Sequence, residues 1–161
     1  MTEMTENQSV TPPAWTSRAE LVDVYLDGLR YDRGSAPVPE EGPGMLTVRL
    51  HATDESAPGS PHLHLHLELI LHGLPADADP NSGAGEDETV FEASLAYRAD
   101  YQLAGEEHLP PAEERRQFIN HTAIPGIWLQ LRQMADIVTS QTLAGRVLLP
   151  TTPPPVVENP S

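Results

Sequence analysis

The chain has 161 residues, enough for one domain of ordinary size, and its 17 prolines and 11 glycines place part of it outside regular structure. The 24 acidic and 9 basic residues give a formal net charge of −15, which repels the phosphates of nucleic acids and anionic membrane surfaces. We therefore expect no nucleic-acid partner. The absence of cysteine excludes disulfides, thiolate metal sites and cysteine nucleophiles.

Both ends of the chain are polar. Residues 1–18 predict a disordered arm in which only Trp15 docks, and residues 151–161 predict a disordered, proline-rich tail. The first residues are acidic, whereas a signal peptide needs a basic and then an apolar segment, and no apolar run approaches membrane-spanning length. A cytoplasmic protein without membrane insertion is expected, with a single domain over residues 19–150.

Four segments between these ends have the pattern of β-strands. The first, residues 21–32, contains Gly28, which indicates a bulge and suits the edge of a sheet. Apolar residues alternate in the second and third, residues 45–53 and 62–74, and a fourth strand or hairpin arm is predicted over residues 90–103. Along the third strand, leucines occupy one face and mostly histidines the other, so the leucine face is expected to pack against a helix.

One long segment, residues 124–144, has apolar residues at the helical period of three or four. The residues that share its buried face are Ile124, Ile127, Trp128, Leu131, Met134, Ala135 and Val138. Pro125 suits the first turn and Gly145 a stop, and a shorter helical stretch precedes this helix. Leu129 and Ile137 fall outside the buried face, which indicates a second apolar contact, such as another subunit.

These elements predict an α+β fold in which a four-stranded antiparallel sheet packs against a long C-terminal helix. The antiparallel arrangement is expected because none of the connections contains a crossover helix. Loops rich in proline, glycine and acidic residues, over residues 33–44 and 75–88, separate strands.

Few residues suggest chemistry. His62, His64 and His66 lie about 6.5 to 7 Å apart on one strand face, so two of them and a neighbour such as His51 could bind a transition metal. A solvated polar face explains the same pattern. The sequence contains no nucleophile elbow, phosphate-binding P-loop or glycine-rich dinucleotide motif, so neither an enzyme nor a cofactor is expected.

Short motifs occur along the chain in a characteristic order. They are Val24-Tyr25 with Tyr31-Asp32, Val90-Phe91, the run from Asp100 to Gly105, Pro125-Gly126-Ile127, Arg132, Val138 and Leu148-Leu149-Pro150. Together with the order of four strands and a helix, these motifs resemble the SecB export chaperones and SecB-like proteins over residues 21–150. The resemblance implies a SecB-like α+β domain that assembles as a homo-oligomer, either a dimer or a tetramer.

The resemblance further implies an ATP-independent holdase that binds unfolded or preprotein chains, and with it a role in protein export. We expect the client-binding surface to consist of aromatic and aliphatic residues, which bind many sequences without matched hydrogen bonds. The expected residues are Tyr25, Leu29, Tyr31, Phe91, Leu95, Tyr97 and Tyr101, with Trp128 and Leu129 on the helix. An oligomer interface is expected at Ile127, Trp128, Leu129 and Leu131.

Two features depart from the family pattern. The acidic positions that engage the translocase motor correspond here to Gly28, Asp32 and Ser94, so only Asp32 is expected to bind the motor. The segment after Pro150 is rich in proline where the family has a second helix. An adaptor that binds one dedicated partner, such as a toxin–antitoxin pair, and a metal-binding domain built on the histidine strand remain the alternatives.

Overall fold

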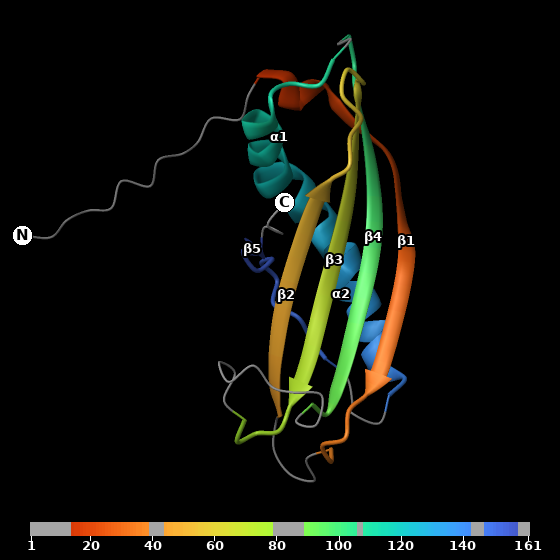
Figure 1. Cartoon of the computed structure of the whole chain (residues 1–161), viewed down its shortest axis with the longest axis vertical. Helices are drawn as coiled ribbons and strands as arrows, with labels where there is room; N and C mark the ends of the chain where they lie inside the picture. The colour runs from red at the N-terminus through yellow and green to blue at the C-terminus, as the bar shows by residue number, and fades with distance from the viewer. Residues whose placement is uncertain (1–13, 39–43, 79–88, 106–107, 143–146, 158–161) are drawn as a thin grey trace, which may run out of the picture.

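The computed structural model describes five segments of the chain, residues 14–38, 44–78, 89–105, 108–142 and 147–157. Residues 1–13 of the predicted arm and residues 158–161 of the predicted tail lie outside the described residues. The described segments form one sheet with the helices on one of its faces (Figure 1).

The sheet has five strands. They are β1 (Ala19–Arg33), β2 (Met45–Asp54), β3 (His62–Leu74), β4 (Phe91–Leu103) and β5 (Val156–Val157). Their order across the sheet is β1-β4-β3-β2-β5, so β2, β3 and β4 are successive neighbours and β1 returns to lie beside β4, as in a Greek key. All pairs among β1 to β4 are antiparallel, and β5 runs parallel to β2.

The prediction of a four-stranded antiparallel sheet is wrong in one respect, because the sheet is mixed and has a fifth strand. The first four strands and their antiparallel pairing agree with the prediction. The added strand, β5, comes from the segment predicted to be a disordered tail. Its two valines are β-branched and pair with the otherwise open edge of β2, a partner far away in the sequence.

The helices form one nearly continuous run. α1 (Ala112–Phe118) continues through a π-helical turn, η3 (Ile119–Ala123), into α2 (Ile124–Ser140), and a short 3-10 helix, η1 (Ala14–Arg18), precedes β1. Pro125 in the first turn of α2 cannot donate a backbone hydrogen bond, and the wider turn before it accommodates the interrupted bonding pattern. The last two residues of the predicted helix lie outside the described residues. None of the helices in the described segments has the length and hydropathy needed to span a membrane.

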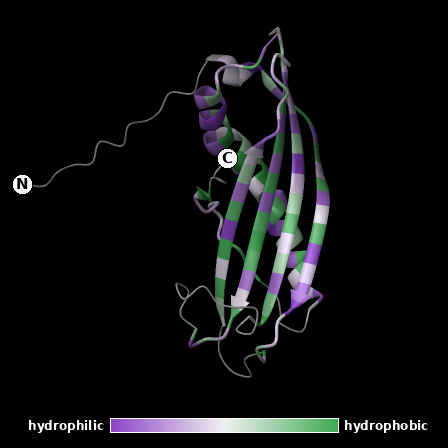
Figure 2. Ribbon diagram, viewed as in Figure 1, coloured by the Kyte–Doolittle hydropathy of each residue, from purple (hydrophilic) through white to green (hydrophobic). Residues whose placement is uncertain are grey.

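The hydrophobic core lies between the helices and one face of the sheet. On β3 the buried residues are Leu63, Leu65, Leu67, Leu69 and Leu71. On β4 every second residue from Phe91 to Leu103 is buried, and Figure 2 shows the resulting alternation of apolar and polar positions along the central strands. The helical face expected to be buried supplies Ile127, Trp128 and Leu131 to this core. The predicted packing of the leucine face is thus confirmed.

A small aromatic cluster fastens the beginning of the described chain to the helices. Trp15 is buried against Phe118, with ring centroids 5.0 Å apart, and Phe118 meets Tyr101 edge to face at 5.1 Å. The Trp15 indole N–H also donates a hydrogen bond to Glu114 Oε2 of α1 at 2.8 Å. Trp15 therefore docks as the sequence predicts, and η1 packs as part of the domain.

Candidate functional site

An exposed apolar strip follows β1, the strand at one edge of the sheet. We define the β1 strip as Leu21, Val22, Tyr25, Leu26 and Leu29, whose exposed fractions range from 37% at Leu26 to 61% at Val22. An unfolded polypeptide exposes similar apolar side chains, and contact with the strip would remove both surfaces from water without a matched pattern of hydrogen bonds.

The pairing of β1 with β4 explains why this strip is exposed. The register places Leu21 opposite Tyr101, Leu26 opposite Tyr97 and Leu29 opposite Leu95. Side chains of directly opposed residues point to the same face, so the three leucines point to the helix side of the sheet, whereas Tyr25, opposite Arg98, points to the polar face. Their partners on β4 are buried whereas the leucines are exposed, so the helices leave these three positions of the edge strand uncovered.

Two irregularities in the register bend β1, one between Leu21 and Asp23 and one between Leu26 and Gly28. The second occurs at the glycine that predicts a bulge at a sheet edge, so both predictions are confirmed. Bulges increase the twist of an edge strand and discourage its pairing with another sheet. Side chains, rather than open backbone groups, are therefore the means by which this edge can contact a partner.

Three of the predicted client-binding residues belong to β1. Tyr25 and Leu29 are exposed and form part of the strip. Tyr31 is partly buried because its ring stacks on that of Phe91, with centroids 5.7 Å apart. The structure therefore presents Tyr25 and Leu29 directly to a partner and Tyr31 only in part.

The four predicted client-binding residues on β4 lie in the core. Phe91, Leu95, Tyr97 and Tyr101 occupy positions that face the helices, and all are buried. Burial raises the pKa of the Tyr97 and Tyr101 hydroxyls above the ordinary value of 10.0, because the phenolate would lose its water. A client would reach these side chains only if the helices moved off the sheet, so their role in binding stays a prediction.

Most of the residues predicted to form an oligomer interface are buried within the single subunit. Ile127, Trp128 and Leu131 are buried against the sheet, whereas Leu129 is 56% exposed. Ile137, two turns further along α2, is exposed as well, as its position outside the buried helical face predicts. Leu129 and Ile137 are thus the apolar side chains of α2 that a second subunit could cover, and the oligomer itself stays a prediction.

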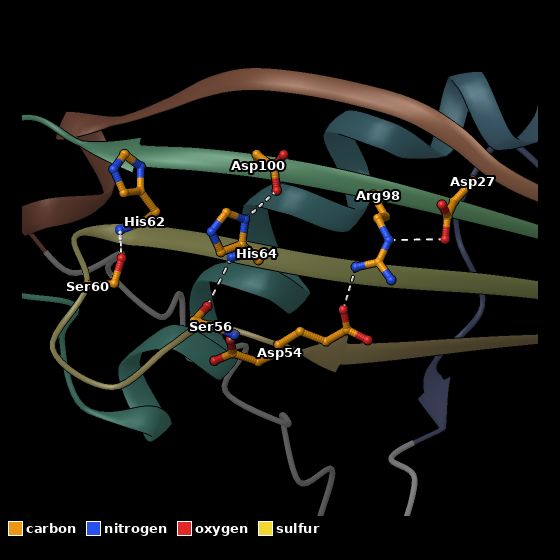
Figure 3. Close-up of polar contacts among 9 residues, drawn as sticks. Asp27, Asp54, Ser56, Ser60, His62, His64, Arg98 and Asp100 are labelled. Carbon is orange, nitrogen blue, oxygen red and sulfur yellow. Dashed lines mark hydrogen bonds and ion pairs between the residues drawn. The ribbon is translucent and has the colours of Figure 1, made fainter.

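The opposite face of the sheet carries the predicted histidines. His62 and His64 stack with ring centroids 6.2 Å apart, and His64 Nδ1 lies 2.6 Å from Asp100 Oδ1 on β4 (Figure 3). Among the residues that the structure describes, no three histidine, aspartate or glutamate side chains are grouped to hold a metal ion. On the same face, His64 pairs with Asp100 and His72 with Glu92, whereas His51 Nδ1 is buried without a hydrogen-bond partner.

Charged side chains connect three elements across this same face. Arg98 of β4 donates from Nε to Asp27 Oδ2 of β1 at 3.0 Å and from Nη1 to Glu55, just beyond β2 (Figure 3). The hydrogen bonds to Glu55 and then to Asp27 raise the pKa of the guanidinium. Asp32, the predicted motor-binding residue, is half exposed and pairs with Arg30 on the same strand. Its carboxylate is accessible but partly neutralised.

A partly buried ion pair joins β2 to α1. Arg115 Nε donates to Asp54 Oδ2 at 2.6 Å, and the backbone N–H of Ser56 donates to Asp54 Oδ1 at 3.0 Å. Burial acts to raise the pKa of Asp54, but the hydrogen bonds from Ser56 and Arg115 outweigh it and hold the pKa below 3.8. The charged pair thereby fixes the first helix of the run to the end of β2.

Three residues of the β1 strip, Leu21, Val22 and Leu26, are absent from the set of binding residues predicted from the sequence. Aliphatic residues in a strand usually indicate burial, and nothing in their own pattern separates them from core positions. The signal that marks them is Gly28 nearby. A bulge that places a strand at a sheet edge also implies that its side chains have a neighbouring strand on one side only.

The comparison of folds gives the site its context. No model of a protein family matches the sequence, and no curated protein is recognisably similar to it. Among solved structures, the SecB-like chaperone Rv1957 of Mycobacterium tuberculosis, in complex with a ChAD peptide from the antitoxin Rv1956 HigA1, superposes with a TM-score of 0.66. This chain has the SecB-like fold. The match covers 88% of this chain and 95% of that chain at 17% sequence identity, and it confirms the predicted SecB-like resemblance at the level of fold.

A second solved structure, a protein of unknown function from Streptococcus agalactiae, aligns with 82% of this chain and 96% of its own. Its sequence identity is 12% and its TM-score is 0.30. The SecB-like assignment of the fold therefore rests on the mycobacterial chaperone.

Proposed function

We propose that this protein is an ATP-independent, non-enzymatic chaperone of the SecB-like type that binds extended, non-native polypeptides. The observation that carries the proposal is the SecB-like fold, shared over 88% of the chain with a chaperone that holds a peptide. The β1 strip supports it, because exposed aliphatic and aromatic side chains can bury the apolar residues of many different clients. The net charge of −15 would keep such complexes in solution.

Suppression of aggregation tests this proposal. Several chemically denatured clients of unrelated sequence are diluted into buffer without ATP, with and without the protein, and light scattering is followed. We expect suppression for all of them. Leu21→Ser combined with Leu29→Ser should weaken it, because two side chains of the strip no longer bury apolar surface.

The matched control replaces exposed polar residues of the same strand, as Glu20→Gln with Asp23→Asn. This control should suppress aggregation as well as wild type at physiological salt. A folded wild-type protein that suppresses the aggregation of no client would contradict the proposal.

A second candidate function is that of an adaptor for one dedicated partner, such as the antitoxin of a toxin–antitoxin pair. It is favoured by the peptide in the mycobacterial structure, which comes from the antitoxin Rv1956 HigA1. An adaptor should bind one protein tightly and leave unrelated unfolded chains to aggregate. The same assay with several clients therefore separates the two functions.

Assembly into a dimer or tetramer is part of the proposal, and α2 offers the surface for it. Leu129 and Ile137 are exposed on this helix, and full burial of a leucine or isoleucine contributes about 1.5 to 3 kcal/mol. Replacing both by Asp should lower the particle mass measured by light scattering at a fixed concentration. Asp at the exposed neighbours Gln130 and Gln133 is the control, and a monomeric wild type at high concentration would contradict the assembly.

Delivery of clients to the export machinery in the cytoplasm is a further part of the proposal. Asp32 is half exposed beside Arg30 and is the single acidic residue at the predicted motor-contact positions. Asp32→Asn should therefore weaken binding to the translocase motor, measured with purified components. If the wild-type protein does not bind the motor, export is excluded and the holdase and adaptor functions remain.

A further inference from the structure

Two histidines at the beginning of β3 lie side by side on the polar face of the sheet. His62 and His64 are two residues apart, and their rings stack with centroids 6.2 Å apart (Figure 3). The backbone N–H of His62 donates to Ser60 Oγ at 3.1 Å, and that of His64 donates to Ser56 Oγ at 3.0 Å. The turn between β2 and β3 therefore holds two imidazoles at a defined spacing.

The carboxylate of Asp100 orients one of the two rings. Asp100 lies directly opposite His64 in the pairing of β3 with β4, and its Oδ1 is 2.6 Å from His64 Nδ1. In the neutral imidazole, a carboxylate at this distance accepts the Nδ1 proton in a hydrogen bond and leaves the lone pair of Nε2 free. Histidines that bind metal ions usually have this arrangement, because the carboxylate fixes the ring and makes the ligating nitrogen more basic.

The second ring can reach the same ion as the first. An imidazole nitrogen binds a transition metal at about 2.0 to 2.1 Å, so two rings on one ion at a tetrahedral angle have centroids about 5.3 Å apart. The observed spacing is 6.2 Å. Because His62 is exposed, a small rotation of its side chain closes the difference while His64 stays paired with Asp100.

The neighbouring strand distinguishes this pair from the next histidine of the row. His66 lies opposite Arg98, whose guanidinium would repel a metal cation. The carboxylate of Asp100 opposite His64 instead attracts a cation. A cation is therefore favoured at His62 and His64 and disfavoured one step further along the strand.

We propose that His62 and His64 form a binding site for a divalent transition-metal ion such as Cu²⁺, Ni²⁺ or Zn²⁺. Imidazole nitrogen suits these ions, and Cu²⁺ should bind most tightly of the three. The described residues supply no third protein ligand beside the pair, so water completes the coordination. The net charge of −15 attracts cations, and an ion held by one imidazole meets the other at a high effective concentration. The site uses no residue of the β1 strip, so it goes beyond the proposed chaperone function.

Titration of the full-length protein with Cu²⁺, in a form without a histidine tag, tests the proposal. Calorimetry gives the number and affinity of the bound ions, and electron paramagnetic resonance of Cu²⁺ reports the ligating nitrogens. We expect wild type to bind one Cu²⁺ through two nitrogen ligands and to bind Zn²⁺ more weakly. The melting temperature should rise with either metal, because the folded chain holds the two imidazoles together.

Matched substitutions on neighbouring positions locate the ion. His62→Gln or His64→Gln should weaken Cu²⁺ binding about tenfold or more, because one of the two ligands is lost. His66→Gln removes the next histidine of the row and should bind Cu²⁺ like wild type. Asp100 is a positioning residue, so Asp100→Asn should weaken binding about tenfold while the resonance spectrum still shows two nitrogens. Circular dichroism checks that each variant is folded.

Equal loss of affinity in His62→Gln and His66→Gln would mean that Cu²⁺ binds to any exposed histidine, and it would overturn the proposal. A wild-type protein that binds no Cu²⁺, or a spectrum without two nitrogen ligands, would overturn it as well. His62 is exposed, so His62→Gln still decides the question if substitution of His64 or Asp100 prevents folding. None of these measurements uses an unfolded client, so a failure to suppress aggregation would contradict the proposed function alone.

Discussion

Tyr25 and Tyr97 are both aromatic residues of β-strands, and their positions in the sheet give them different surroundings. Tyr25 lies on the edge strand β1 and is 42% exposed. Tyr97 lies on β4, which has a strand on each side and faces the helices, and it is buried. Burial removes Tyr97 from direct contact with a partner. It also makes ionisation of the hydroxyl unfavourable in the folded state, an effect that the dependence of stability on pH can measure.

Replacing Tyr97 and Tyr101 by Phe should make the fold less sensitive to alkali. Burial raises the pKa of both hydroxyls above 10.0, so the unfolded chain loses these protons at a lower pH than the folded chain. Wild type therefore keeps its stability below about pH 10 and loses it as the pH rises toward the raised values of the folded state. The melting temperature, measured from about pH 8 to about pH 11, should fall less steeply in the double variant.

The exposed Tyr25 provides the control, since Tyr25→Phe should leave the alkaline profile of the wild type unchanged. An equally steep fall in the double variant would mean that other groups cause the alkaline loss of stability.

Asp54→Asn should lower the free energy of unfolding at neutral pH by about 1 to 3 kcal/mol, because it weakens a partly buried, charged hydrogen bond with Arg115. The pKa of Asp54 is lowered in the folded state, so its stabilising effect is present above 3.8 and is lost as the pH falls through the folded value. Urea unfolding of wild type and variant should therefore differ at pH 7 and converge as the pH falls below 3.8 and through the lowered pKa of Asp54.

The control is Asp27→Asn, which weakens the more exposed pair with Arg98 and should lower stability less than Asp54→Asn does, because water screens an exposed ion pair. An Asp54→Asn variant as stable as wild type at neutral pH would show that the pair does not fasten α1 to β2.

At the scale of elements, the sequence predicts helices and strands whose apolar residues repeat at a regular period, but it does not predict which distant segments pair in the sheet. The predicted third strand agrees with β3 to the residue, and the long helix begins at the predicted Ile124, because burial repeats every second residue in one and every third or fourth in the other. The pairing of β1 with β4 and of β5 with β2 joins segments far apart in the chain. No local pattern encodes such partners, so the strand order and the fifth strand could not be predicted.

The same limit explains the candidate site. Alternation correctly places Phe91, Tyr97 and Tyr101 on one face of their strand, but it does not tell whether the helices cover that face at that strand. Tyr25 and Leu29 are exposed because their strand lies at the edge, and only Gly28 gave a sequence signal of that position. The hydrogen bonds from Trp128 to Pro150 O and from Arg132 to Leu149 O depend on tertiary packing and have no signature in the sequence.

Two glycines in different elements lead to opposite predictions. A Cβ at Gly126 of α2 would meet no atom within 4 Å, so Gly126→Ala should stabilise the helix by about 0.5 to 1 kcal/mol and raise the melting temperature by a few degrees. A Cβ at Gly73 of β3 would lie 2.3 Å from Cε1 of the buried Phe91 ring. Gly73→Ala should therefore destabilise the fold by about 1 to 3 kcal/mol. Calorimetry of both variants checks the signs, and a shift in the same direction would contradict one of the two arguments.

At the scale of the whole molecule, the two edges of the sheet differ in what they offer a partner. One edge of the sheet is the bulged β1 with its apolar strip, and the other is the short β5, which pairs with β2. One face of the central strands is buried under the helices, and the other carries mostly polar, partly exposed side chains. Apolar contact with another chain is therefore directed to the edges and to the exposed residues of α2, while the acidic surface acts over a longer range.

The dependence of client binding on salt separates the proposed holdase from the adaptor. The net charge of −15 attracts basic segments, but salt screens this attraction beyond about 8 Å under physiological conditions. Salt does not weaken the burial of apolar surface. The affinity of a holdase that acts through the β1 strip should fall modestly up to moderate salt and then stay constant. The affinity of an adaptor held by charge pairs should keep falling.

Leu21→Ser with Leu29→Ser should weaken client binding by the holdase about tenfold at every salt concentration. A permanently unfolded fluorescent client is titrated with each protein, and circular dichroism checks that the variant is folded. Affinity that falls continuously with salt would favour the adaptor, and no binding by the wild-type protein at any salt concentration would contradict the chaperone proposal.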